Sequence, residues 1–291
     1  LAFCLAHDVS SGTSPQQPQT LVERGFELLQ RGETIAAEEE FRRALEIDPQ
    51  LGDGHYGLGQ VRLVQRRLPE AEQELREAVR LSPDSGPAHA ALASVLIKTG
   101  KGGEARGQLE KAVAVNPQDV ESSYQLALLL ADVGEVKRSL ELLDEIVRKS
   151  PNHDAAREQL GLHALRRGDI DAAAVEANGI LRSRPKSAEG HRLMALILWR
   201  QRDTEAALAE GAQAMTGEPD SPSMMALEAV GLWKLNQKKE AQQALLRAYK
   251  VQPQIIKSEV LCRLILCDGA DISLVQDFLK RGRWVVFPPP P

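Results

Sequence analysis

The chain has 291 residues, of which 43% are hydrophobic and 26% charged, as is typical of a water-soluble, well-packed protein. Its formal net charge of -5 and aromatic content of 4% argue against nucleic-acid binding, which calls for a basic face and stacking aromatic rings. No uninterrupted apolar run is long enough to span a bilayer. Three cysteines, Cys4, Cys262 and Cys267, are an odd number and predict no disulfide framework.

The first residues allow two interpretations. The chain begins at Leu1 rather than Met, so residues 1–6 are either the end of a cleaved export signal or a truncated end. Ser, Gln, Pro and Gly dominate the stretch that follows, which is typical of disorder. We expect residues 1–17 to be a disordered lead-in or the remnant of an export signal. Localisation stays open between cytoplasmic and exported.

Helical periodicity then runs from Leu21 to about Gly282, with apolar residues three and four apart and almost no alternation of period two. Prolines recur every 34 residues without a slip. A fixed period of this size indicates one supersecondary unit copied head to tail. The sequence therefore predicts seven repeats over residues 18–255, each starting 31 residues before its proline: Pro49, Pro83, Pro117, Pro151, Pro185, Pro219 and Pro253.

Small residues recur at fixed places in each repeat and predict two closely packed helices. The eighth position is Gly or Ala throughout, as in Gly25 and Gly59, and the twentieth is Ala in all repeats but one. Small residues at one place on a helix let another helix come close. Glycine stands at the fifteenth position of four repeats, where a helix end needs a left-handed residue: Gly32, Gly100, Gly134 and Gly168.

After the repeats, residues 256–282 predict a pair of capping helices. Residues 256–267 have the pattern of one more first helix, and Asp271 is placed to cap a final helix that ends at Lys280. A solenoid needs such a cap over its last apolar face. Residues 283–291 end in four prolines and predict an extended proline-rich tail along the surface, or else a disordered one.

This pattern of 34 residues, with small residues at positions eight, twenty and twenty-seven and proline at thirty-two, resembles the tetratricopeptide repeat. The resemblance implies an all-α fold, a right-handed superhelical solenoid of seven helix-turn-helix repeats with a C-terminal capping helix pair. Two repeats depart from it, because Ala177 and Gly211 replace a large residue at position twenty-four. We expect a looser seam between the fifth and sixth repeats, with Trp199 as the side chain that fills it.

The resemblance also implies that the first helix of each repeat lines a concave groove, where positions five, nine, twelve and thirteen meet a ligand. The groove is then mostly apolar, with aromatic anchors and a basic edge, and suits an amphipathic helix or extended segment with acidic flanks. The alternative for Trp199 and Trp233 is packing between neighbouring repeats. The candidate partner-binding residues are Tyr56, Tyr124, Leu128, Leu162, Arg166, Arg192, Trp199, Arg200, Trp233 and Lys234.

Catalytic and metal-binding patterns are absent from the sequence. His55, His89 and His191 share one repeat position, but residues on successive repeats do not converge on one ion, so we interpret them as packing residues. Cys262 and Cys267 are five apart on a predicted helix and point in different directions. No phosphate-binding loop or nucleophile motif occurs, and we expect neither a cofactor nor an enzyme.

The sequence thus favours a non-enzymatic scaffold that binds a peptide or partner protein in its concave groove, without a membrane span. One alternative is an accessory part of a larger enzyme or of an export or assembly machine. Another is a self-associating module that forms a homo-oligomer.

Overall fold

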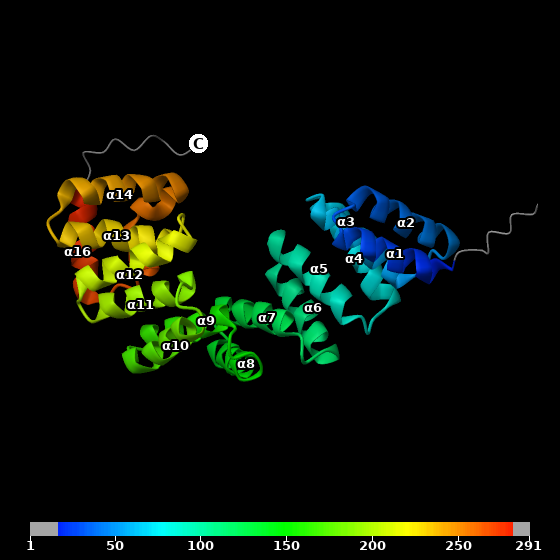
Figure 1. Cartoon of the computed structure of the whole chain (residues 1–291), viewed down its shortest axis with the longest axis horizontal. Helices are drawn as coiled ribbons and strands as arrows, with labels where there is room; N and C mark the ends of the chain where they lie inside the picture. The colour runs from blue at the N-terminus through cyan, green and yellow to red at the C-terminus, as the bar shows by residue number, and fades with distance from the viewer. Residues whose placement is uncertain (1–16, 282–291) are drawn as a thin grey trace, which may run out of the picture. The chain divides into compact units, whose positions relative to one another are not determined.

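The computed structural model of the chain describes residues 17–281, and the predictions for the first sixteen and the last ten residues lie outside this range. Every regular element along residues 17–281 is a helix (Figure 1). The first eight are α1 (Pro18–Gln30), α2 (Thr34–Ile47), α3 (Gly52–Val64), α4 (Leu68–Leu81), α5 (Gly86–Lys98), α6 (Gly102–Val115), α7 (Val120–Asp132) and α8 (Val136–Lys149). The others are α9 (Asp154–Arg166), α10 (Ile170–Ser183), α11 (Ala188–Arg200), α12 (Thr204–Gly217), α13 (Pro222–Lys234), α14 (Lys238–Val251), η1 (Pro253–Ile256), α15 (Ser258–Leu264) and α16 (Gly269–Arg281).

The helices alternate between 13 and 14 residues from α1 to α14, so each pair is one repeat of the 34-residue period. Consecutive helices pack against each other within a repeat, as α1 does on α2 and α3 on α4. The all-helical repeat fold predicted from the prolines and small residues is confirmed.

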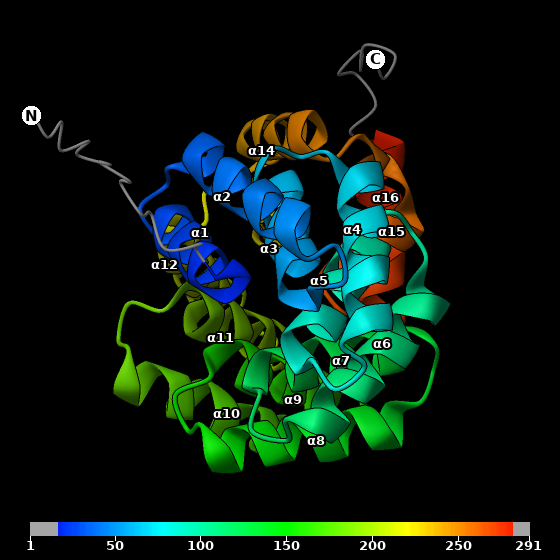
Figure 2. The same cartoon turned by 90° about the vertical axis from the view of Figure 1, so that its right-hand side faces the viewer.

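The chain forms two compact units, residues 1–139 and 140–291, and the division falls within α8. In the first unit α1 packs on α3 and α3 on α5, and in the second α9 packs on α11. Figures 1 and 2 show the helices of each unit stacked in chain order. Because first helices contact first helices of neighbouring repeats, they line one common side of each unit, which we call the inner face.

Each turn between the two helices of a repeat closes with the same backbone hydrogen bond. The amide after the left-handed residue donates to a carbonyl five residues earlier, as from Lys101 to Leu96 at 2.8 Å, which is the Schellman arrangement. The four predicted glycines adopt φ of 75–85°. The other repeats keep the left-handed backbone without glycine, at Arg66, Arg202 and Asn236, with φ of 59–69°.

In the first two repeats, the glycine at position eight receives a large side chain from the second helix of the same repeat. A Cβ atom added at Gly25 would lie 2.6 Å from the ring of Phe41, and one added at Gly59 would lie 2.6 Å from Leu75. Both distances are far below van der Waals contact, so only glycine fits at these two positions without moving the partner. Phe41 and Leu75 have no exposed surface and form the centre of their repeats.

The looser seam expected at the fifth and sixth repeats stays a prediction, and a leucine of the following repeat packs in the core there. Leu193 comes so close to Gly161 that an added Cβ would lie 2.3 Å from it, and it packs in the same core as the small Ala177. Leu227 lies beside Gly211, and a Cβ atom added at Gly211 would be 3.5 Å from its side chain. In both repeats the small residue at position twenty-four is followed by a leucine at position six of the next repeat, Leu193 or Leu227, and Trp199 belongs to the same core.

Gly211 offers a direct test of this packing. We expect Gly211→Ala to stabilise the second unit by up to about 1 kcal/mol, since alanine is favoured over glycine inside a helix and its methyl group meets only ordinary contacts there. Gly161→Ala is the matched control and should destabilise, because its methyl group would overlap Leu193. The measurement is the urea midpoint followed by tryptophan fluorescence, which reports on the second unit since all tryptophans lie after residue 140. A lower midpoint for Gly211→Ala would contradict the packing.

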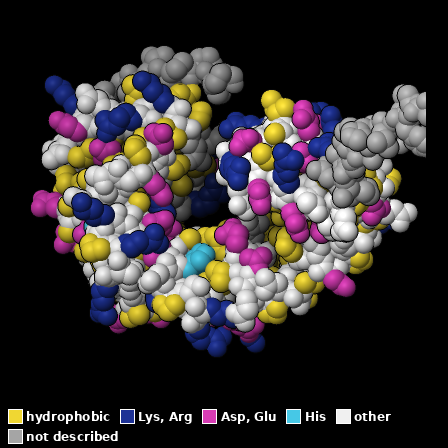
Figure 3. Space-filling model, turned by 45° about the vertical axis from the view of Figure 1, so that its right-hand side comes forward, with side chains coloured by type: hydrophobic (Ala, Val, Ile, Leu, Met, Phe, Trp, Pro, Cys, Tyr) yellow, Lys and Arg dark blue, Asp and Glu magenta, His cyan; other side chains and the backbone are white. Residues whose placement is uncertain are grey.

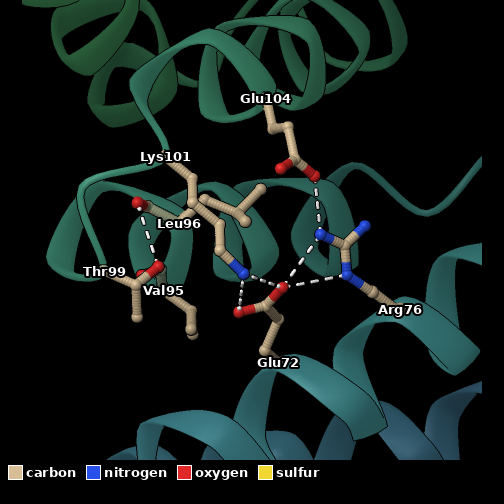
Figure 4. Close-up of polar contacts among 7 residues, drawn as sticks. All are labelled: Glu72, Arg76, Val95, Leu96, Thr99, Lys101 and Glu104. Carbon is tan, nitrogen blue, oxygen red and sulfur yellow. Dashed lines mark hydrogen bonds and ion pairs between the residues drawn. The ribbon is translucent and has the colours of Figure 1, made fainter.

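Ion pairs join the second and third repeats on the side of the second helices (Figure 4). Glu72 of α4 accepts hydrogen bonds from Lys101 at 2.8 Å and from Arg76, and Arg76 also reaches Glu104 of α6 at 2.6 Å. Thr99 donates to the carbonyl of Val95 beside them.

The seam between the third and fourth repeats has the same network with opposite charges. Arg106 pairs with Glu135 at 2.5 Å, and Glu110 pairs with Arg138 at 3.3 Å. Each of these four side chains occupies the repeat position of an oppositely charged one in the preceding seam.

The cap differs in detail from its prediction. In place of one helix over residues 256–267, a short 3-10 turn from Pro253 precedes α15, and α15 ends with Leu266 in the left-handed region at φ 53°. The amide of Cys267 donates to the carbonyl of Cys262, the same closing bond as in the repeats. The cap then turns back into α16, which packs on both α13 and α15.

Candidate functional site

Aromatic side chains cluster on the inner face of the first unit. The rings of Phe26 and Tyr56, from α1 and α3, lie 5.6 Å apart, and Phe26 also meets Phe41 edge-on at 5.0 Å. Phe26 and Tyr56 are half-buried. Burial raises the pKa of Tyr56, against a hydrogen bond with Gln60 that lowers it, so the phenol stays neutral. The pair offers aromatic surface with a polar edge.

Tyr124 and Leu128 of α7 belong to the same unit and the same repeat positions, and both are half-buried. Of the predicted site residues, Tyr56, Tyr124 and Leu128 therefore lie in the first unit, and the other seven lie in the second.

Trp199 and Trp233 lie inside the second unit. Trp199 has no exposed surface, and its indole Nε1 donates to the carboxylate of Asp271 at 3.3 Å. Trp233 is 8% exposed and its ring centre lies 5.2 Å from that of Phe278 in α16. Both tryptophans therefore pack inside the protein, which is the alternative to partner binding. They contact the cap as well as the adjoining repeat.

The predicted basic edge is also engaged within the second unit. Arg200 donates to the carbonyls of Leu266 at 3.0 Å and Leu165 at 3.4 Å. Lys234 is exposed with its Nζ 4.8 Å from the centre of the Trp199 ring, a cation–π contact. Arg166 is exposed and Leu162 half-buried, so these two also stay accessible. On the face that Figure 3 shows, cations and anions are interspersed rather than gathered by sign.

Arg192 holds a buried carboxylate in place. Its guanidinium donates twice to Glu158, at 2.5 Å and 2.8 Å, and also contacts Glu218. Burial raises the pKa of Glu158 above its ordinary value, although the hydrogen bonds from Arg192 act in the opposite direction. Arg192 thus links the fifth repeat, through Glu158, to the end of its own sixth repeat, through Glu218.

The three histidines at one repeat position tie neighbouring repeats together. In each, Nε2 donates to the carbonyl of the preceding repeat's proline, and Nδ1 faces a polar side chain on the second helix of the same repeat. Arg157 makes the same two contacts in the fifth repeat. The pairs are His55 with Glu74, His89 with Gln108, His191 with Glu210 and Arg157 with Glu176, at 2.7–2.8 Å.

Among residues 17–281, no three His, Cys, Asp or Glu side chains gather where they could hold a metal ion. In the same range, no helix combines the length and apolar content that crossing a membrane requires.

Three features of the site were not predicted from the sequence. Asp271 was expected only to cap a helix, yet it accepts from Trp199 and Arg202. Arg202 lies at a turn position for which the sequence predicts no side-chain role, yet it pairs with Asp268 and Asp271. The repeat pattern contains no signal for the path of α16, because the cap lies beyond the last period.

Family models described as tetratricopeptide repeat match residues 28–95, 65–129, 103–178 and 158–222 of the chain. No curated protein matches it in sequence.

Solved structures share the fold at low sequence identity. A tetratricopeptide repeat protein from Parabacteroides merdae ATCC 43184 is 16% identical with a TM-score of 0.65, and the match covers 90% of this chain and 98% of that one. YrrB, a TPR protein with an unusual peptide-binding site, is 23% identical with a TM-score of 0.51, over 58% and 88% of the two chains. PilW, a widely conserved type IV pilus biogenesis factor, is 17% identical with a TM-score of 0.58, over 69% and 94%. The shared fold is that of a protein–protein interaction scaffold.

Proposed function

This chain belongs to the tetratricopeptide repeat family, and we propose that it is a non-enzymatic scaffold that binds a peptide or partner protein on the inner face of its first unit. The observation that supports this most is the half-buried ring pair of Phe26 and Tyr56. Aromatic residues at the centre of an interface contribute most of the binding energy in many complexes.

The difference between the two units supports the choice of face. In the second unit the cap covers Trp199 and Trp233, and Arg200 bonds to backbone carbonyls. In the first unit Tyr56, Tyr124 and Leu128 keep part of their surface in solvent.

The partner segment is an amphipathic helix or an extended strip with apolar side chains on one side. Apolar groups would pack on Phe26, Tyr56 and Leu128, and the neutral Tyr56 hydroxyl would supply a hydrogen bond.

A peptide selection tests the proposal. Displayed random peptides are selected on the full chain, and the affinity of the best one is measured for the wild type and for Tyr56→Ala and Tyr124→Ala. We expect each substitution to weaken binding by about five- to thirtyfold, which corresponds to the roughly 1–2 kcal/mol that an aromatic contact contributes. Circular dichroism verifies that the variants stay folded.

The matched control is Ile35→Ala, which removes a large apolar side chain that is 77% exposed on α2, a second helix away from the inner face. Its affinity should equal that of the wild type. Equal losses for Ile35→Ala and Tyr56→Ala, or no loss for either tyrosine, would count against the inner face as the binding surface.

The accessory-module and self-association hypotheses stay predictions. Light scattering over a concentration series tests the second, since a mass that stays at one chain excludes it.

A further inference from the structure

The cap docks on a defined edge of the sixth and seventh repeats. This edge consists of the last residues of the first helices and the turn that follows, at repeat positions twelve, thirteen and fifteen, and we call it the turn edge. In these two repeats it comprises Trp199, Arg200, Arg202, Trp233 and Lys234. Figure 1 shows α16 beside α13 there, and the two helices are in contact.

Two acidic residues at the start of α16 hold it to this edge. Arg202 donates to Asp271 at 2.6 Å and also pairs with Asp268, while Trp199 donates to Asp271 from the other side. Asp271 is 1% exposed and also accepts a hydrogen bond from the backbone amide of Asp268 at 3.2 Å, so contacts within the protein replace its solvation. Further along α16, Phe278 packs on Trp233.

The backbone of Arg202 is unusual and its side chain explains why an arginine stands there. Its φ is 69°, at the repeat position where four of the other repeats have glycine. A left-handed backbone disfavours any residue with a Cβ atom, so glycine is the default. Compared with glycine at this position, the arginine adds the ion pairs to Asp268 and Asp271.

Arg66 in the second repeat is likewise an arginine with a left-handed backbone, but no cap residue pairs with it. It occupies the same position with φ 59°, and among the seven repeats only the second and sixth have a cation there. Its side chain is exposed and makes no hydrogen bond or ion pair within residues 17–281. A guanidinium with five donors is thus exposed at the turn edge.

The residues around Arg66 match the rest of the cap-binding edge in character. Positions twelve and thirteen of the second repeat are Leu63 and Val64, and those of the third repeat are Ile97 and Lys98. Val64 is 62% exposed and Ile97 is 38% exposed, so both offer apolar surface at this edge. Lys98 occupies position thirteen of its repeat, as Lys234 does in the seventh repeat.

We propose that the turn edge of the second and third repeats is a docking site for a helix of a partner protein with the pattern of α16. That helix begins with two acidic residues three apart and continues with apolar residues four and seven positions after the second acid, as Asp268, Asp271, Val275 and Phe278 do. The carboxylates pair with Arg66, and the apolar side chains cover Val64 and Ile97. The site shares no residue with the proposed Tyr56 surface and goes beyond that function.

A foreign helix is the occupant rather than α16 of a second copy. Val275 and Phe278 are fully buried in their own unit, so α16 would have to leave its core to reach another chain. The acidic start matches the unpaired Arg66 and Lys98 by charge.

The test uses a fluorescein-labelled peptide with the sequence of residues 266–281 and Cys267 replaced by Ser, titrated with the full chain and followed by anisotropy. We expect saturable binding that Arg66→Gly weakens at least tenfold, because charge-assisted hydrogen bonds are lost. Arg66→Gly keeps the fold, since glycine fits the left-handed backbone better than arginine does. A peptide with Asp268→Asn and Asp271→Asn should bind with a similar loss.

Arg31→Ala is the matched control, because it removes an exposed arginine from the corresponding turn of the first repeat. It should leave the affinity unchanged. Absence of binding at millimolar peptide, or equal affinity for Arg66→Gly and the wild type, would overturn the proposal. So would a loss on Arg202→Gly alone, which would mean that the peptide replaces α16 in the cap. A doubled mass in light scattering that Arg66→Gly abolishes would identify a second copy as the occupant instead.

Discussion

We expect Trp199→Ala to lower the free energy of unfolding of the second unit by about 3–5 kcal/mol, the range for removal of a buried aromatic side chain. Trp199 has no exposed surface and packs within the core that joins α11 and α13 to the cap. The substitution also removes the indole donor to Asp271 and the ring beneath Lys234.

Urea unfolding followed by the remaining tryptophan fluorescence measures the effect. Trp199→Phe should recover most of the loss, because it restores apolar volume but not the hydrogen bond to Asp271. Val175→Ala is the control for an apolar truncation in the same unit, since Val175 is 65% exposed and should shift the midpoint little. A wild-type midpoint for Trp199→Ala would show that the side chain is a surface anchor after all.

The second large effect is expected from Arg192→Met. Removal of one partner of a buried ion pair costs about 3–5 kcal/mol, because the other charge is left without compensation. Here that charge is on Glu158, which is 5% exposed. Methionine keeps much of the volume of the arginine stem, so the loss reports on the charge rather than on a cavity.

The loss in Arg192→Met should depend on pH in a defined direction. Burial already raises the pKa of Glu158 above the ordinary 4.5, and without Arg192 the hydrogen bonds that lower this pKa are gone. A carboxyl group whose pKa is raised by folding destabilises the fold as it ionises. The deficit should therefore be full at pH 8 and shrink as the pH falls through the raised pKa toward 4.5.

The double substitution Glu158→Gln with Arg192→Met is the control, and its stability should recover and lose this pH dependence. The urea midpoints of Arg192→Met and of the double variant are each measured at pH 5 and at pH 8 and compared. A deficit in Arg192→Met that is equal at both pH values would mean that Glu158 reaches solvent in the variant.

Local features of this chain were predictable because their causes are local. Each proline and small residue acts on the helix pair that contains it, as Gly25 and Phe41 illustrate, so the repeat frame follows from spacing alone. The packing of Leu193 in the same core as Ala177 involves two repeats. It could have been found by comparing position twenty-four of one repeat with position six of the next.

The cap was predictable only as a helix pair. Asp271 meets Trp199 across 72 residues, and no period connects them. The burial of Trp199 and Trp233 depends on that contact, so the sequence could name them as aromatic anchors but not say whether a partner or α16 covers them. The left-handed backbone at Arg66 and Arg202 likewise follows from the turn's hydrogen bond rather than from residue preference.

The opposite charges of the two ion networks make each repeat selective for its own neighbour. If the fourth repeat stacked on the second, Glu72 would face Glu135 and Arg76 would face Arg138, so like charges would meet at both contacts. Helix pairs with the same shape would otherwise be interchangeable along a stack. The charges thus oppose a slip of one whole repeat during folding and the exchange of repeats between two copies of the chain.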